Sequence, residues 1–145
     1  IDALYSKHSG GSTPNKDGVH VISVGGTSFK RYLDLAKLLN IKTAVIRDND
    51  GDYKKTCVDN YENYLMQHAK VFADNDNNRK TFEICLYQDN KAVCDKHLGA
   101  DRKKLSVLDY MLAEKTEAAF TLLKDAKDDL FAPKYIQEAI AWIRA

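Results

Sequence analysis

Three aspartates at alternate positions stand out in the stretch AVIRDNDGDY, which covers residues 44–53. Asp48, Asp50 and Asp52 come directly after an apolar run that suits a buried strand. Carboxylates this close repel one another and raise each other's pKa, so they require either open water or a bound cation. The stretch could therefore be a solvated turn or a site for a divalent metal ion.

A solvated turn is the simplest interpretation, because Asp, Asn and Gly favour turns through local hydrogen bonds. An EF-hand is a second interpretation, and it requires glycine at position six and glutamate at position twelve of the loop. Counted from Asp48, these positions hold Tyr53 and Asp59, and a strand rather than a helix precedes the loop. The EF-hand is excluded, whereas the turn stays open.

A pair of aspartates at a strand end could also bind Mg²⁺ or Mn²⁺, which prefer hard oxygen ligands. Haloacid-dehalogenase-like phosphatases carry a similar pattern, in which four apolar residues precede DxDG. In those enzymes the aspartate strand comes before the strand that ends in Ser or Thr. Here the GGTS loop (25–28) comes before the aspartates, so the order of the motifs argues against that family.

The segments around the aspartates predict a βαβ unit. HVISV (20–24) suits a buried strand, 29–39 has the apolar spacing of a helix that Thr27 or Ser28 could cap, and KTAVIR (42–47) suits a second strand. The two strands should be parallel neighbours with a right-handed crossover. Ligands bind outside the carboxyl ends of such strands, where both GGTS and DNDGD lie.

The rest of the chain is predicted to be mainly helical. We expect a helix over about 57–70 and a polar loop at 74–80, while TFEICLY (81–87) fits either a strand or a helix that begins at Thr81. Four further helical patterns follow: KAVCDKHL, SVLDYMLAE, TEAAFTLLKDAK and PKYIQEAIAWIRA. Because IDALYSKH reads as the tail of a helix, we expect a fragment of a longer protein that forms one domain over 1–145.

Composition narrows the classes of function. The 22 basic and 21 acidic residues give a net charge of +1, so nucleic-acid binding would need a local basic patch. No stretch approaches the ~20 apolar residues of a membrane helix, and the start lacks a signal-peptide pattern. The three cysteines and four histidines have no zinc spacing, and a disulfide framework is not expected. We expect a cytoplasmic protein.

Four elements, in order, resemble one known family. The stretch VHVISVGGTSFKRYLDLAKLLNIKTAVIRDNDGDY is similar to the Toprim domain of the overcoming-lysogenisation-defect (OLD) family of ATP-dependent endonucleases, which includes the GajA-like nucleases of Gabija phage defence. TFE at 81–83, KTEAAF at 115–120 and APKYIQEAIAWI at 132–143 resemble later elements of that domain. The resemblance implies an α/β, Rossmann-like fold with a parallel sheet flanked by helices and a helical C-terminal part.

The resemblance also implies a catalytic site. Asp48 and Asp50 match the aspartate pair that binds divalent metal in Toprim nucleases, and Glu83 matches a further acidic residue near the metals. Lys115 matches a basic residue that meets the scissile phosphate. Two Mg²⁺ or Mn²⁺ ions about 4 Å apart could stabilise both oxygens of the cleaved bond, and the lysine adds a fixed charge. Without the family, Glu83 and Lys115 would be ordinary residues of helix starts.

The family pattern also includes parts that this sequence does not contain. Toprim domains carry a glutamate at the end of their first strand, and that segment would lie upstream of Ile1. The ABC-type ATPase domain, through which ATP would act, also precedes the Toprim domain. The resemblance therefore implies a DNA endonuclease or nickase domain that alone binds metal weakly and cuts DNA poorly or not at all. Expected partners are DNA, the ATPase domain and further copies of the full-length protein.

Basic side chains could contact DNA phosphates, although most such clusters are simply solvated. The candidates are Lys30 and Arg31 on the first helix of the βαβ unit and Lys103 in the run 102–104. GGTSFK lacks the spacing of a P-loop or a Rossmann fingerprint. Two other functions stay open: another Toprim phosphoryl-transfer enzyme, primase-like or RNA-processing, and a non-catalytic Toprim module for assembly or DNA docking.

Overall fold

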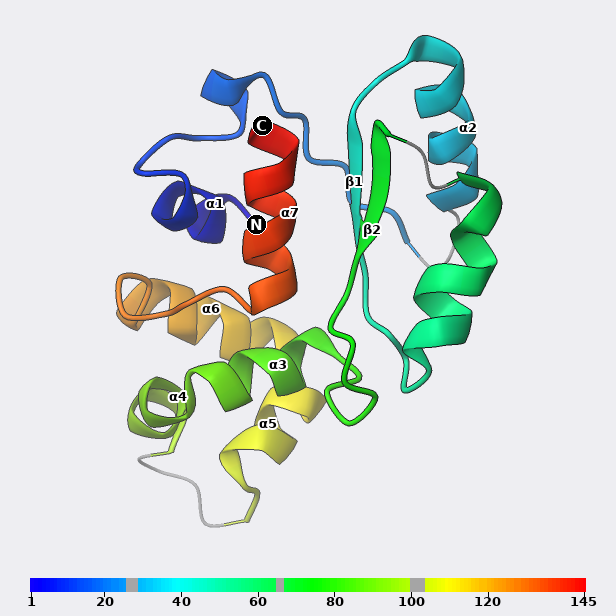
Figure 1. Ribbon diagram of the computed structural model, residues 1–145. Helices are drawn as coiled ribbons and strands as arrows, with labels where there is room; N and C mark the ends of the chain where they lie inside the picture. The colour runs from blue at the N-terminus through cyan, green and yellow to red at the C-terminus, as the bar shows by residue number, and fades with distance from the viewer. Residues whose placement is uncertain (26–28, 65–66, 100–103) are drawn as a thin grey trace.

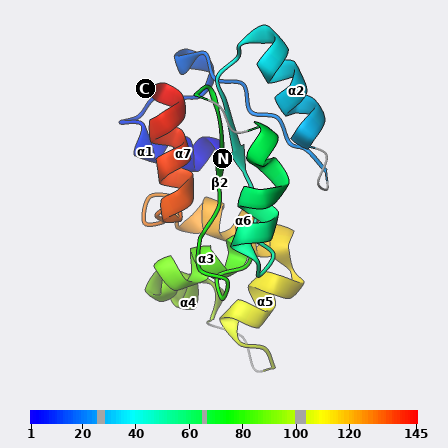
Figure 2. The same ribbon diagram turned by 45° about the vertical axis from the view of Figure 1, so that its right-hand side comes forward.

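A pair of parallel strands lies at the centre of the protein. The computed structural model describes residues 1–25, 29–64, 67–99 and 104–145. In this part of the chain, β1 (Thr43–Ile46) pairs in parallel with β2 (Ala69–Phe72). Figures 1 and 2 show α7 (Lys134–Arg144) on one side of the strands and α2 (Phe29–Leu39) on the other. The prediction of an α/β fold with a parallel sheet flanked by helices is therefore confirmed.

Both faces of the strands are covered, which explains why β1 is apolar from Ala44 to Ile46, whereas β2 carries one exposed charged residue, Lys70. Val45 packs on the α2 side with Leu33, Tyr61 and Ala69. Ala44 and Ile46, its neighbours in β1, pack instead against the cluster on the α7 side. The alternation of side chains along a strand thus sends successive residues of β1 into two different cores.

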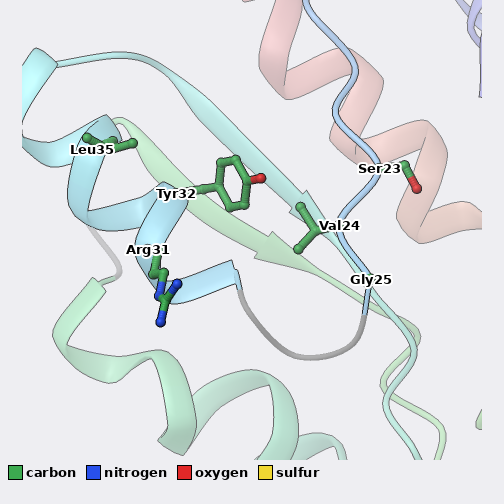
Figure 3. Close-up of a pocket in the computed structure, with 6 residues that line it drawn as sticks. All are labelled: Ser23, Val24, Gly25, Arg31, Tyr32 and Leu35. Carbon is green, nitrogen blue, oxygen red and sulfur yellow. The ribbon is translucent and has the colours of Figure 1, made fainter.

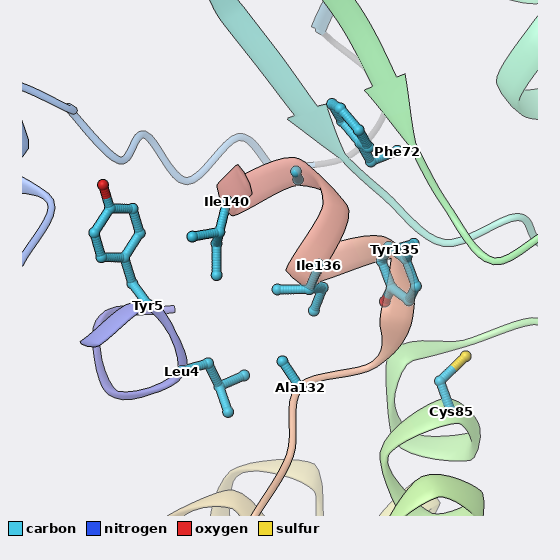
Figure 4. Close-up of a cluster of buried hydrophobic side chains, with 9 residues drawn as sticks. Leu4, Tyr5, Phe72, Cys85, Ala132, Tyr135, Ile136 and Ile140 are labelled. Atoms are coloured by element: carbon cyan, nitrogen blue, oxygen red, sulfur yellow. The ribbon is translucent and has the colours of Figure 1, made fainter. Parts of the chain in front are cut away.

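The core on the α7 side joins the two ends of the chain. Figure 4 shows Leu4 and Tyr5 of α1 (Asp2–His8) beside Ile136 and Ile140 of α7. The rim of this contact is polar: the Tyr5 hydroxyl donates to Asp17 at 2.7 Å, and the same carboxylate pairs with Arg144 at 2.8 Å.

Four helices form a third packed unit between the sheet and α7 in the sequence. They are α3 (Phe82–Asp89), α4 (Lys91–Leu98), α5 (Val107–Ala113) and α6 (Lys115–Asp125). Their buried side chains make one cluster: Leu86, Cys94, Leu98, Met111, Ala118, Leu122, Ala126 and Leu130. All four helical patterns predicted after residue 90 are confirmed, and the ambiguous segment TFEICLY is a helix preceded by an extended Thr81.

The prediction of a strand at 20–24 is wrong. The segment HVISV has no regular secondary structure, and Val21 and Ile22 are 51% and 61% exposed. Within the described ranges, no backbone hydrogen bond ties it to β1, so the predicted parallel pair of 20–24 and 43–47 does not form. A β-branched run forms a strand only where a neighbouring strand offers backbone hydrogen bonds. In this protein β1 pairs with β2 and not with residues 20–24.

The expected helix over 57–70 is also corrected. A π-helical turn, η2 (Lys54–Val58), leads into a 3-10 helix, η3 (Asp59–Tyr64), and β2 begins at Ala69. The helical spacing of Cys57 and Tyr61 is real, since both side chains are buried, but it ends before the short strand AKVF. The proposed caps Thr27 and Ser28 lie outside the described residues.

Candidate functional site

The aspartate stretch lies at the carboxyl edge of the two strands. Residues 47–53 follow β1 and residues 73–80 follow β2, so in a parallel pair both loops leave at the same edge. This is the edge at which open parallel sheets bind ligands. The expectation that Asp48 and Asp50 stand at this edge therefore agrees with the fold.

Asn49, between the two aspartates, ties the loops together. Its side chain is almost fully buried, at 1% exposure. The amide nitrogen donates to the carbonyl oxygens of Asp74 and Asp76 at 2.8 and 2.9 Å, and the amide oxygen accepts from the Gly51 N–H at 2.8 Å. The centre of the stretch is thus a packed structural element. Asn49 was not predicted from the sequence, because an asparagine between two aspartates is typical of an exposed turn.

Asp48 connects the end of β1 to the start of α3. Its carboxylate accepts a hydrogen bond from the Phe82 N–H at 2.8 Å. The N-cap residue Thr81 makes no capping hydrogen bond of its own, so Asp48 performs this role from a distant part of the chain. A carboxylate is favourable at a helix N-terminus because the backbone dipoles there are positive. This contact brings the strand end next to the first turn that carries Glu83.

Glu83 and Lys115 form an ion pair. The Lys115 ammonium, on the first residue of α6, lies 3.0 Å from one carboxylate oxygen of Glu83. The side chain of Glu83 is 15% exposed, and its other oxygen is buried without a hydrogen-bond partner among the described residues. Lys115 is half exposed and borders a pocket of about 460 Å³ formed by residues 112–117. The two residues singled out from far along the chain are therefore in contact.

Asp50 has a different partner, because its carboxylate lies 2.6 Å from the guanidinium of Arg47. The backbone of Asp50 is left-handed, with φ at +54°, and its N–H donates to the Lys80 carbonyl at 3.2 Å. Asp52 is directed elsewhere: it accepts from the Lys55 N–H at 3.1 Å and thereby caps η2. The three alternate aspartates therefore have three different environments.

Electrostatics links the residues of this edge. Burial raises the pKa of Asp48, and the hydrogen bond from Phe82 opposes that rise. The nearby charges of Glu83 and Asp50 raise the pKa further, whereas Lys115 lowers it. The pKa of Asp48 therefore depends on the charges of all three other candidate catalytic residues, whose roles stay predictions.

The donor atoms fit a divalent cation in type. Asp48 and Glu83 offer hard carboxylate oxygens, and two buried oxygens, Glu83 Oε2 and Thr81 Oγ1, have no hydrogen-bond partner within the described ranges. In the same residues, however, no group of three acidic, histidine or cysteine side chains is close enough to hold one ion. A metal at this edge would therefore need a third ligand to move toward it, and Asp50 is the nearest candidate on the same loop.

The candidate DNA-binding residues lie on α2. The Lys30 ammonium is 5.8 Å from the centre of the Tyr64 ring. Arg31 borders a shallow pocket of about 430 Å³, together with Tyr32, Leu35 and residues 23–25. Figure 3 shows Tyr32 turned toward this segment. Lys103 lies outside the described residues, and none of the described contacts connects Lys30 or Arg31 to the aspartates.

Comparison with known proteins gives one match. Residues 1–50 match the family model described as the overcoming lysogenization defect protein-like TOPRIM domain. The match confirms the resemblance to the Toprim domain of the OLD family and suggests a nuclease or phosphoryl-transfer function. It includes Asp48 and Asp50, whereas Glu83 and Lys115 lie beyond it. No curated protein and no solved structure matches the chain.

Among the described residues, no helix is both long and apolar enough to cross a bilayer.

Proposed function

We propose that this chain is the catalytic domain of a divalent-metal-dependent DNA endonuclease or nickase of the OLD type. One observation carries the proposal: Asp48, just after β1, and Glu83, at the start of α3, converge with Lys115, and one oxygen of Glu83 has no partner among the described residues. Acidic oxygens beside a lysine are what phosphodiester hydrolysis requires. The family match to residues 1–50 supports the same class of reaction.

In this mechanism, Asp48, Asp50 and Glu83 would hold Mg²⁺ or Mn²⁺. The bound ion supplies positive charge to the attacking and leaving oxygens of the phosphodiester. Asp48 is fixed by its hydrogen bond to Phe82, so it presents its remaining oxygen without losing conformational freedom on binding. If Glu83 served as a ligand, Lys115 would be free of its ion pair and could turn its ammonium toward the negative phosphate.

The test is the nicking of supercoiled plasmid DNA by the full-length polypeptide, with Mn²⁺ or Mg²⁺ added to metal-stripped protein. Asp48→Asn should lower the rate by at least about 100-fold, because it removes a ligand of the ion whose positive charge acts on the transition state. Asp52→Asn is the matched control, since Asp52 belongs to the same stretch but caps η2. Nicking at the normal rate by Asp48→Asn, with contaminating nuclease excluded, would overturn the mechanism.

A non-catalytic Toprim module for assembly or DNA docking is the second candidate. It is favoured by the lack of a preformed three-ligand group in the described residues and by the pairing of Glu83 with Lys115. Such a module need not bind Mn²⁺, so calorimetric titration with Mn²⁺ separates the two functions. A primase-like or RNA-processing enzyme would bind the ion and fail to cut plasmid, and it is tested with RNA and primed templates under the same conditions.

The partners of the domain follow from the same resemblance. We infer that DNA is the substrate, that Lys30, Arg31 and Lys103 contribute phosphate contacts, and that an upstream ABC-type ATPase domain makes cutting depend on ATP. Copies of the full-length protein are proposed to assemble. If Lys30 and Arg31 contact phosphates, replacing both by Ala should weaken DNA binding and reduce its dependence on salt.

A further inference from the structure

One edge of β1 has no neighbouring strand among the described residues. The described sheet has two strands, so β1 is paired only along the edge that faces β2. The Thr43 N–H, for example, donates to the His68 carbonyl at 2.8 Å. Because alternate residues of a parallel strand bond to the same neighbour, Ala44 and Ile46 direct their N–H groups to the opposite edge. No described residue makes a hydrogen bond with these two groups, so this edge of β1 can accept another strand.

The free edge also lacks the features that usually prevent an exposed strand from pairing. Proteins protect such edges with lysine or other charged side chains, with proline, or with a bulge. The four residues of β1, TAVI, include no charged residue and no proline, whereas β2 carries the exposed Lys70. An unprotected apolar edge is a template for strand addition, in which an extended segment of another chain continues the sheet.

Exposed apolar side chains of α2 extend the apolar surface near this edge. Tyr32, Leu35 and Leu39 lie at helical spacing on one side of α2 and are 43% to 65% exposed. Tyr32 and Leu35 line a shallow pocket together with residues 23–25. Figures 1 and 2 show that the segment before α2 passes β1 on its way to that helix. The apolar face of α2 is therefore wider than the core that it packs against.

The segment 20–24, HVISV, has the properties of a strand that could add to such an edge. It has no regular secondary structure, and Val21 and Ile22 are both more than half exposed. It is β-branched at three of its five positions and contains no acidic residue, lysine or arginine. Like charges would therefore not oppose each other if it paired with β1. One chain thus presents both an unpaired strand edge and an unpaired β-branched run.

We propose that two copies of this chain associate by strand addition, in which residues 20–24 of each copy pair with the free edge of β1 in the other. The exchange is reciprocal, so it uses the same surface of both copies and closes with two-fold symmetry. It goes beyond the proposed nuclease activity and does not depend on it. It assigns a surface and a mode of pairing to the proposed assembly of copies.

The exposed apolar surface on this side of the molecule is just large enough for such a contact. The half-exposed apolar side chains that each copy contributes are Val21, Ile22, Tyr32, Leu35, Leu39 and Ile41. If each buries roughly 50 Å², two copies bury about 600 Å² of apolar surface, and roughly 1,000 Å² in all at the usual polar share. This is about the lower limit for a specific interface. Copies held by this contact should therefore exchange readily.

The experiment measures hydrogen exchange of the Ala44 and Ile46 amides in the full-length polypeptide. The wild type should protect both amides. Val21→Lys/Ile22→Lys, which places two charges on the added strand, should lower their protection factors by at least about 10-fold. The Thr43 amide, which bonds to His68 within one copy, is the internal reference for folded protein and should stay protected. Rapid exchange of Ala44 and Ile46 in the wild type would overturn the proposal.

A mixing experiment distinguishes pairing between copies from pairing within one copy. The Val21→Lys/Ile22→Lys protein is labelled with ¹⁵N, so that its peptides differ in mass, and is refolded with an excess of unlabelled wild type. Its Ala44 and Ile46 amides should regain protection, because the wild-type copies supply intact residues 20–24. No recovery would mean that the run pairs within its own copy, and the proposal would fail.

Phe120→Lys/Leu123→Lys is the matched control. Phe120 and Leu123 are exposed apolar residues of α6, at 63% and 45%, and the double substitution adds the same charge. It should leave the protection of Ala44 and Ile46 unchanged. Equal loss of protection in both double variants would contradict the proposal. Full protection in Val21→Lys/Ile22→Lys would show that a different segment covers the edge, and would overturn it as well.

Discussion

The carboxylate of Asp48 caps the helix that carries Glu83, through a 2.8 Å hydrogen bond from the Phe82 N–H. Asp48 and Phe82 are 34 positions apart in the sequence, yet this contact joins the end of a strand to the first turn of a helix. It also places Asp48 in a partly buried position near two other carboxylates, which raises its pKa. Asp48 thus stabilises the fold by accepting a hydrogen bond, whereas its partly buried negative charge destabilises the fold.

This double role predicts the pH dependence of stability without metal. A pKa that is higher in the folded protein adds stability at low pH, and that stability is lost as the pH rises through the folded-state pKa. At neutral pH, Asp48→Asn should therefore raise the melting temperature in EDTA, because the amide oxygen can still accept from Phe82 without a charge. The gain should shrink as the pH is lowered through the raised pKa of Asp48 and the carboxylate takes up its proton.

Mn²⁺ should reverse the order of the two proteins in the same melting experiment. The ion should raise the melting temperature of the wild type, since a ligand that binds only the folded state stabilises it. It should do little for Asp48→Asn. Asp48→Ala serves as the control for the hydrogen bond, because it removes the acceptor as well as the charge and should melt lower than Asp48→Asn. Equal melting temperatures for Asn and Ala would show that the cap does not matter.

Asn49 is expected to be more important for stability than either neighbouring aspartate. Asn49→Ala should lower the free energy of unfolding by roughly 2–3 kcal/mol, because it leaves buried backbone groups of both loops without partners. Asn77→Ala is the matched control in the same pair of loops. Asn77 accepts one exposed hydrogen bond, from the Tyr53 N–H at 2.9 Å, and its loss should cost less than about 1 kcal/mol. Chemical denaturation measures the free energy of unfolding of both variants. Similar losses would contradict the proposal that Asn49 holds the two loops together.

The parts of the fold that the sequence predicted correctly have local signals. The helices from α4 to α7 follow apolar spacing, and β1 follows an unbroken apolar run. HVISV has the same kind of signal as β1 but lacks a partner strand, and pairing is a tertiary property that a local pattern does not contain. β2 was missed because its four residues follow directly on a segment with helical spacing, and β2 supplies the partner of β1.

Some residues of the candidate site could be identified from the sequence and others could not. The family resemblance singled out Asp48, Asp50, Glu83 and Lys115, and the last two form an ion pair, whereas the catalytic roles of all four stay predictions. Asn49 and Arg47 were not identified, because an asparagine in a turn and an arginine after a strand are ordinary until their partners are known. Their importance depends on burial and on contacts with Asp74 and Tyr61, which belong to other loops and helices.

His8 predicts a second pH dependence, at the junction of α1 with the segment before α7. Its Nε2 accepts a hydrogen bond from the Ala132 N–H at 3.1 Å, which only the neutral ring can do. Burial, and secondarily the charge of Lys7, lowers the pKa of His8 below 6.5. Stability from this contact should be complete above that pH and be lost as the pH falls through the lowered pKa. The protection factor of the Ala132 amide against hydrogen exchange should fall in that range, and in His8→Phe it should be low at every pH.

Lys115 gives the sharpest separation of metal binding from catalysis. Lys115→Ala should reduce plasmid nicking by at least about 100-fold, because it removes a charge that acts on the phosphate in the transition state. It should not weaken Mn²⁺ binding, since Lys115 pairs with Glu83 and its loss frees an oxygen for the ion. Lys124→Ala, in the last turn of the same helix, is the matched control and should leave both quantities unchanged. Loss of Mn²⁺ binding in a folded Lys115→Ala protein would instead mean that the lysine holds Glu83 in place and that its role is structural.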